Sequence, residues 1–146
     1  MGQGKRGETG TRDNPLVVTA AVIEKDGRIL IAKRKKGWRF GGKWEFPGGK
    51  IEPCETPEEC LKRELREELG IEAQIGEFFC SSIYTYPHVT VKLLVYHAFH
   101  LSGEFELYDH EEIRWVTRAQ LLQYDFPEAD KVIIEKLIGA ASERQS

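Results

Sequence analysis

The segment at residues 56–70 predicts a helix whose two ends are both marked in the sequence. Thr56 can cap the first turn with its hydroxyl group, Pro57 suits the first helical position, and Glu59 can complete a capping box. Gly70 is a residue type that commonly ends a helix. Apolar residues recur at helical spacing between these signals, so one face of this helix must pack on a hydrophobic core.

The segments on both sides of this helix have the pattern of β-strands. Apolar runs rich in β-branched and aromatic residues predict strands at residues 16–23, 28–32, 75–86, 89–99 and 113–116. Asp26-Gly27 favours a tight hairpin between the first two runs. A short helix is expected after Thr117, and an apolar stripe at residues 133–138 predicts a terminal helix. This order favours an α+β domain in which helices cover a mixed sheet.

Length and composition indicate one domain that works in the cytoplasm. The chain has 146 residues, of which 15–146 are predicted to form the domain and 1–14, polar and glycine-rich, a flexible tail. The tail has no apolar stretch, so we expect neither a secretory signal nor contact with a membrane. The three cysteines lack the paired spacing of a zinc site or a redox pair, which favours a reducing compartment.

The charge balance argues against a nucleic-acid polymer as the partner. The net charge is −3, from 21 basic and 24 acidic residues, which is no basic surplus of the kind that binds a phosphate backbone. We therefore expect one site for a small molecule, in a monomer or a homodimer.

Three glutamates of the predicted helix fall on one arc beside its apolar stripe. With Leu61 set at zero, Glu67, Glu64 and Glu68 lie at about 240°, 300° and 340° around the helix axis. Like charges at this spacing destabilise a helix, so a cation is expected to compensate for them. A hard cation such as Mg²⁺, or Mn²⁺ in its place, takes oxygen ligands and shares its shell with substrate phosphates. The alternative is a solvated helix face with no ligand.

A glycine pair precedes the helix. Gly48 and Gly49 have no β-carbon, so the backbone can come close to a metal ion or a phosphate there. A main-chain carbonyl in this loop can then be a further metal ligand.

Residues 49–71, GKIEPCETPEECLKRELREELGI, resemble the signature of the Nudix hydrolase family at every position that the signature specifies. The matching residues are Gly49, Glu55, Arg63, Glu64, Leu65, Glu67, Glu68, Gly70 and Ile71. Seven of these positions are fixed, and Leu65 and Ile71 need only be apolar. With each of the seven fixed residue types at roughly 7% abundance, such a match arises by chance on the order of once in 10⁸ windows. The order of the predicted strands also resembles the family.

This resemblance implies an α/β/α sandwich with a mixed sheet, and hydrolysis of a nucleoside diphosphate linked to another group. It implies that Glu64, Glu67 and Glu68 are the catalytic metal ligands, with the carbonyl of Gly48 beside them. Magnesium in such a site neutralises charge on phosphate oxygens and activates a bound water.

The resemblance also gives supporting roles to Gly49, Glu55 and Arg63. The last two are implied to brace the glycine loop against the helix. As an alternative, Arg63 makes only an ion pair with Glu67 along the helix.

Some members of the family take a further acidic residue from a late loop, as a metal ligand or a general base. Asp109 and Glu111 are the candidates here. The position relative to Trp115 favours Asp109, whereas Glu111 has the longer reach. A charged surface turn is the alternative.

The pieces WEFPGGKIE, CETPEE and DFPEAD resemble the MutT-like branch of the family, which includes oxidised-guanine nucleotide hydrolases and CTP pyrophosphohydrolases. That resemblance implies cleavage of a nucleoside triphosphate to a monophosphate and pyrophosphate. The implied substrate-binding residues are Arg34, Phe46, Lys50 and Asp130. The related oxidised-guanine enzyme has asparagine at the place of Asp130, so the base that this position reads stays open between guanine and cytosine.

Two rival functions remain on the same fold. One is hydrolysis of ADP-ribose, a nucleotide sugar or a dinucleoside polyphosphate, and the other is a regulatory module without catalysis.

Trp38 and Phe40, in a basic and glycine-rich loop, either stack on a base or only pack the loop.

Overall fold

The computed structural model describes residues 10–37 and 40–145, with side chains described as far as residue 139. Most of the predicted tail, and Trp38 of the basic loop, therefore lie outside the described residues. The described helices and strands are β1 (Leu16–Lys25), β2 (Arg28–Arg34), β3 (Trp44–Glu45), α2 (Pro57–Leu69), β4 (Glu72–Tyr86), β5 (Val89–Ser102), β6 (His110–Val116), the 3-10 turns η1 (Ala119–Gln123) and η2 (Glu128–Asp130), and α3 (Lys131–Gln145).

The strands form one mixed sheet with the order β3-β2-β1-β5-β4, and β6 pairs with β2. β1 runs parallel to β5 along residues 16–23, whereas the other pairs are antiparallel. Asp26 and Gly27 have φ angles of 53° and 78° and form the predicted hairpin, in which Lys25 pairs with Arg28. β1 pairs with β2 only next to this hairpin, so the free edge of β1 is open to the loop that follows β3.

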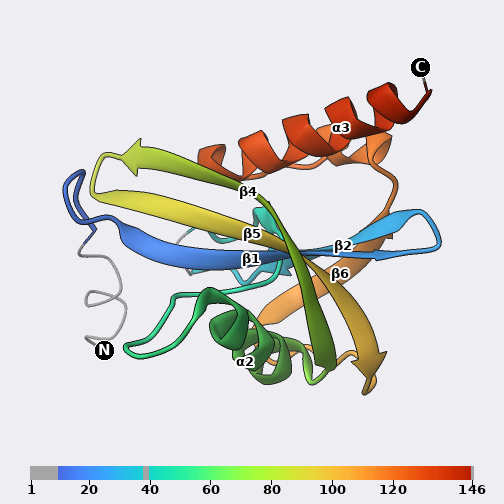
Figure 1. Cartoon of the computed structure of the whole chain (residues 1–146), viewed down its shortest axis with the longest axis horizontal. Coiled ribbons are helices and arrows are strands. Elements are labelled where there is room, and N and C mark those ends of the chain that lie inside the picture. Colours follow the sequence, from blue (N-terminus) through green and yellow to red (C-terminus); the bar gives the residue numbers. More distant parts are fainter. Residues whose placement is uncertain (1–9, 38–39, 146) are drawn as a thin grey trace.

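Helices cover both faces of the sheet, with α3 on one side and α2 on the other (Figure 1). Leu61, Leu65 and Leu69 of α2 share one buried cluster with Leu30 of β2. Ile29 and Ile31 of β2 point into the opposite cluster, which contains the buried residues Leu121, Phe126, Ile133 and Leu137. This alternation follows from the period of two along a strand. The predicted α/β/α sandwich with a mixed sheet is thus confirmed.

The predicted ends of α2 are also confirmed. The hydroxyl of Thr56 accepts a hydrogen bond from the amide of Glu59 at 3.0 Å, and the Glu59 carboxylate accepts one from the amide of Thr56 at 2.9 Å. Gly70 ends the helix with a φ of 69°. These caps fix where α2 begins, and thereby which of its residues face the sheet. Among the described residues, no helix is long and apolar enough to cross a membrane.

Candidate active site

The loop that follows β3 is hydrogen-bonded along the open edge of β1. The amide of Ala21 donates to the carbonyl of Pro47 at 2.7 Å, and the amide of Thr19 donates to the carbonyl of Gly49 at 2.8 Å. A Cβ atom on Gly48 would lie 2.0 Å from the carbonyl oxygen of Thr19, so a larger residue does not fit there. Successive carbonyls of an extended segment point in opposite directions, so the Gly48 carbonyl points away from β1.

The glutamates of α2 differ in their environments. The side chain of Glu64 is 15% exposed and that of Glu67 is 58% exposed. Burial raises the pKa of Glu64. Burial, together with the charges of Glu45 and Glu64, raises the pKa of Glu68 well above its ordinary value. The helix thus presents two partly buried carboxylates whose ionised forms are costly, and one exposed carboxylate.

The Arg63 guanidinium links the glycine loop to α2. It donates to both oxygens of Glu55, at 2.5 and 3.0 Å, and to the carbonyl of Lys50 at 3.3 Å. It also donates to Glu64 and Glu67, each at 3.1 Å. Arg63 holds the pKa of the Glu55 carboxyl at about 2. The structure therefore contains both the contacts of a loop brace and the helix ion pair.

Glu45, at the end of β3, lies between these carboxylates and a second group of polar residues. Its Oε1 atom accepts a hydrogen bond from Arg34 at 2.9 Å, and its Oε2 atom lies 2.7 Å from Nε2 of His110. Potential ligand atoms of Glu45, Glu68 and His110 all lie within 4.8 Å of one another. Burial and the Glu45 charge raise the pKa of Asp130 well above its ordinary value, although Arg34 acts in the opposite direction.

Two adjoining cavities contain these groups. The carboxylate cavity, of about 340 Å³, is lined by residues that include Glu64, Glu68, Gly48, Gly49 and Phe46. The aromatic cavity, of about 320 Å³, is lined by residues that include Phe40, Tyr86, Val91, Leu93 and Pro127. Both cavities share Arg34, Glu45, Lys50 and Asp130 in their linings. The two cavities therefore adjoin, and one has carboxylates in its lining while the other has mainly apolar walls.

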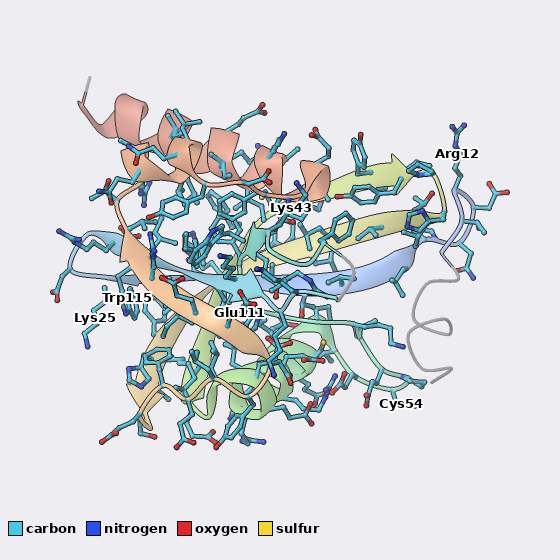
Figure 2. All side chains as sticks on the ribbon, turned by 180° about the vertical axis from the view of Figure 1, so that it is seen from behind. Arg12, Lys25, Lys43, Cys54, Glu111 and Trp115 are labelled. Atoms are coloured by element: carbon cyan, nitrogen blue, oxygen red, sulfur yellow. The ribbon has the colours of Figure 1, made fainter. Side chains whose placement is uncertain are left out.

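The two late-loop candidates lie in different surroundings. The charge of Asp109 contributes to the raised pKa of Glu68, so this carboxylate acts on the carboxylate cavity. Glu111 accepts a hydrogen bond from the amide of Lys36 at 3.5 Å and lies 4.0 Å from the Lys33 ammonium. Figure 2 shows Glu111 and Trp115 toward the two ends of β6.

A larger cavity of about 570 Å³ lies at the β1–β2 hairpin, near Lys25 and Trp115, which Figure 2 labels. Its lining offsets Lys25 and Arg28 with Asp26 and Glu104, so it gives a phosphate no net attraction. It shares no residue with the carboxylate cavity, and we do not place the active site there.

The carboxylate cavity fits a divalent cation. Oε1 of Glu68 is buried and has no hydrogen-bond partner among the described residues. An unpaired buried carboxylate oxygen is costly unless a cation or a proton neutralises it. Glu64, Glu67 and Glu68, with the Gly48 carbonyl, offer the oxygen ligands that a hard cation prefers.

Comparison with known proteins agrees with this geometry. The model of the NUDIX domain matches residues 13–137 of the chain. The chain is a Nudix hydrolase. It is 38% identical to a CTP pyrophosphohydrolase of Escherichia coli over 130 residues, which cover 87% of this chain and 94% of that protein. Enzymes of this family generally require a divalent metal ion.

Two further relatives are similar over most of their length. An 8-oxo-dGTP diphosphatase of Haemophilus influenzae is 35% identical over 84% of this Nudix hydrolase and 90% of the relative. The solution structure of the E. coli ORF135 protein is 36% identical and superposes with a TM-score of 0.80, over 92% of this chain and 98% of that one. These similarities establish the Nudix fold and the Nudix hydrolase class for this chain.

The structure brings together most of the residues that the sequence indicated. Glu64, Glu68, the glycine loop and the four predicted substrate-binding residues all line the two cavities, whereas Glu67 is exposed and is in neither lining. Phe46 lines the carboxylate cavity but is only 3% exposed and stacks on Phe126, with 5.2 Å between the ring centroids.

Sequence analysis missed two residues of the site, Glu45 and His110. Glu45 directly precedes Phe46, and its short strand gave no separate signal. His110 stands beside Asp109, in a segment where only the acidic residues match a role that the family resemblance implies. The available sign was a histidine directly after the candidate ligand Asp109 and shortly before the predicted strand at residues 113–116.

Replacing Gly49 with alanine will misplace a carboxylate of this Nudix hydrolase. The added Cβ would lie 2.3 Å from the carboxyl carbon of Glu64, a flexible side chain that can turn away. We expect a correctly folded protein with kcat lowered about tenfold or more, because small displacements of active-site groups are costly. The matched control is Gly139→Ala, where nothing lies within 4 Å of the added atom. Equal activity of the two variants would show that Glu64 is not held by this contact.

Proposed function

We propose that this enzyme hydrolyses a nucleoside triphosphate, normal or modified, to a nucleoside monophosphate and pyrophosphate. The observation that supports this proposal is that a cavity lined by carboxylates adjoins a cavity with mainly apolar walls. One end has carboxylates and the glycine loop for phosphates and a cation, and the other end has aromatic and aliphatic walls for a base. A nucleotide is a ligand with this same division.

The charged end is proposed to hold the phosphates. Glu64, Glu67 and Glu68, with the Gly48 carbonyl, would hold Mg²⁺ or Mn²⁺, which lowers the pKa of a bound water and neutralises charge on the phosphates. Lys50 lines both cavities and is exposed, so its ammonium group can pair with a phosphate as the substrate enters.

The apolar end is proposed to hold the base. Phe40 and Tyr86 form one aromatic wall, with ring centroids 4.9 Å apart. The amide of Ala129 donates to the Tyr86 hydroxyl at 2.9 Å, which holds this wall beside η2. Arg34 and Asp130 are polar groups of the shared lining that can reach a base, and Phe46 lines the carboxylate cavity beside them.

Asp109 is proposed as the late-loop acid that assists the reaction. Its charge acts on Glu68, so it is close enough to influence the carboxylate cavity. Glu111 is engaged by Lys33 and Lys36 instead. A carboxylate at the position of Asp109 can accept a proton from the attacking water.

The relatives support a triphosphate as the substrate. Two of them are named for hydrolysis of CTP and of 8-oxo-dGTP, and each aligns with most of this chain. The three free cysteines support the further proposal that the enzyme works in the reducing cytoplasm.

A substrate panel tests the proposal. With Mg²⁺ present, we expect CTP, dCTP, 5-modified dCTP, dGTP or 8-oxo-dGTP to give a monophosphate and pyrophosphate. ADP-ribose and a dinucleoside tetraphosphate are expected to react at least about tenfold more slowly in kcat/KM, because the described residues give the two adjoining cavities one apolar end for a base and no second one. Cleavage of those two compounds with silence on all triphosphates would refute the proposal. Silence on the whole panel would indicate a binding module.

A further inference from the structure

His110 has a buried position that the proposed chemistry does not use. It begins β6, is 4% exposed, and pairs with Arg34 across an irregularity of β2 between Lys33 and Arg34. Its Nε2 atom lies 2.7 Å from Oε2 of Glu45, whereas its Nδ1 atom is buried without a hydrogen-bond partner among the described residues. Only one of the two ring nitrogens therefore has a structural task, which is the contact with Glu45.

Two residues hold the Glu45 carboxylate from different sides. β3 and β6 both pair with residues 32 and 33 of β2, so they lie on opposite edges of that strand. Glu45 extends from β3, and Arg34 of β2 donates to its Oε1 atom at 2.9 Å. His110 extends from β6 and contacts the Oε2 atom of Glu45. With both oxygens engaged, the carboxylate has one orientation.

The surroundings of Glu45 make this restraint necessary. Glu68 lies close to it, and the charge of Glu45 acts on both Glu68 and Asp130. Without the imidazole, Oε2 of Glu45 would lose the contact that holds the carboxylate in its present orientation. Arg34 would then lose the orientation of one of its partners, Oε1 of Glu45, which helps to place its guanidinium in the lining that the two cavities share.

We propose that His110 is a positioning residue for nucleotide binding, which orients Glu45 and, through it, Arg34. The inference rests on the proposed function, since it assumes that a nucleotide occupies the joined cavities. His110 touches no substrate in this arrangement. Its effect must therefore show in affinity more than in the chemical step.

The test compares His110→Gln with His110→Asn. The glutamine amide nitrogen can reach the place of Nε2, whereas the shorter asparagine can reach only the place of Nδ1, which has no partner. The dissociation constants of CMP, dGMP and ADP-ribose are measured by calorimetry, together with kcat, KM and the midpoint of thermal unfolding. We expect asparagine to weaken binding and raise KM about tenfold, with kcat changed less than threefold, and glutamine to restore binding to within about threefold of the wild type.

The outcomes separate this inference from the proposed function. The choice of nucleotide by the wild-type enzyme decides the substrate class, and the ratio of variant to wild type, for whichever probe binds, decides the role of His110. Unchanged affinity in both variants, with only a lowered unfolding midpoint, would make His110 a core residue and overturn the inference. Equal loss of affinity in both variants would overturn it too, and a wild-type protein that bound none of the three probes would overturn both proposals.

Discussion

Replacing Glu68 with glutamine will abolish turnover and, in the absence of metal, stabilise the fold. Glutamine keeps the shape of the side chain but is a poor ligand for a hard cation. We expect kcat to fall at least about a thousandfold, which corresponds to about 4 kcal/mol of the activation barrier. Stability should rise at neutral pH because burial and neighbouring carboxylates raise the pKa of Glu68, so its ionised form weakens the metal-free protein.

The matched control for this variant is Glu58→Gln in the first turn of the same helix. Glu58 is exposed and lies outside both cavities of the active site. The Glu58→Gln substitution should change kcat less than twofold. Steady-state kinetics and thermal unfolding in EDTA measure the two effects. Retained activity in Glu68→Gln would contradict a metal site on α2, even if the fold were more stable.

The helix that carries Glu68 was predictable because its signals are local. Thr56, Glu59 and Gly70 mark its ends within a single segment, and the structure contains each of the expected capping contacts. The arc of glutamates follows from helical geometry once those ends are known. The signature then assigned chemistry to positions whose spacing was already fixed.

The contacts of Glu45 were not predictable in the same way. Glu45 and His110 are 65 positions apart and meet only because β3 and β6 pair with the same strand. Nothing local in either segment gives the register of those pairs. The shift of register between Lys33 and Arg34 also depends on tertiary packing. Pairing between strands that are far apart in the sequence therefore could not be predicted from local patterns.

Asp130 was predictable as a site residue from its resemblance to a base-reading position, but its charge state was not. The sequence alone leaves a carboxylate that only accepts hydrogen bonds. In the structure, Asp130 lies beside Glu45 and is bonded by the Phe46 backbone. Burial then favours the protonated form, which offers one donor and one acceptor.

The second large effect on activity is expected from substitutions of Asp130. Asp130→Ala should lower kcat/KM for the preferred triphosphate about a hundredfold, because the base loses a buried hydrogen-bonding partner. Asp130→Asn should lose less than about tenfold, since a carboxamide, like a protonated carboxyl, has one acceptor oxygen and a donor. The control is Glu128→Ala, an exposed residue of the same turn that pairs with Lys131. If asparagine lost as much as alanine, Asp130 would read the base in its ionised form.

The pH dependence of stability gives an independent check on the protonated form. Since the pKa of Asp130 is raised on folding, the stability that it contributes is fully present below the ordinary value of 3.8 and is lost as the pH rises through the raised value. Asparagine cannot ionise, so Asp130→Asn should unfold about 3 °C or more above the wild type at pH 8. That difference should vanish near pH 4, where wild-type Asp130 is protonated in the folded protein. Glu64 and Glu68 are present in both proteins, so their titrations cancel in the comparison, and a difference that stayed constant with pH would place the effect outside the Asp130 carboxyl.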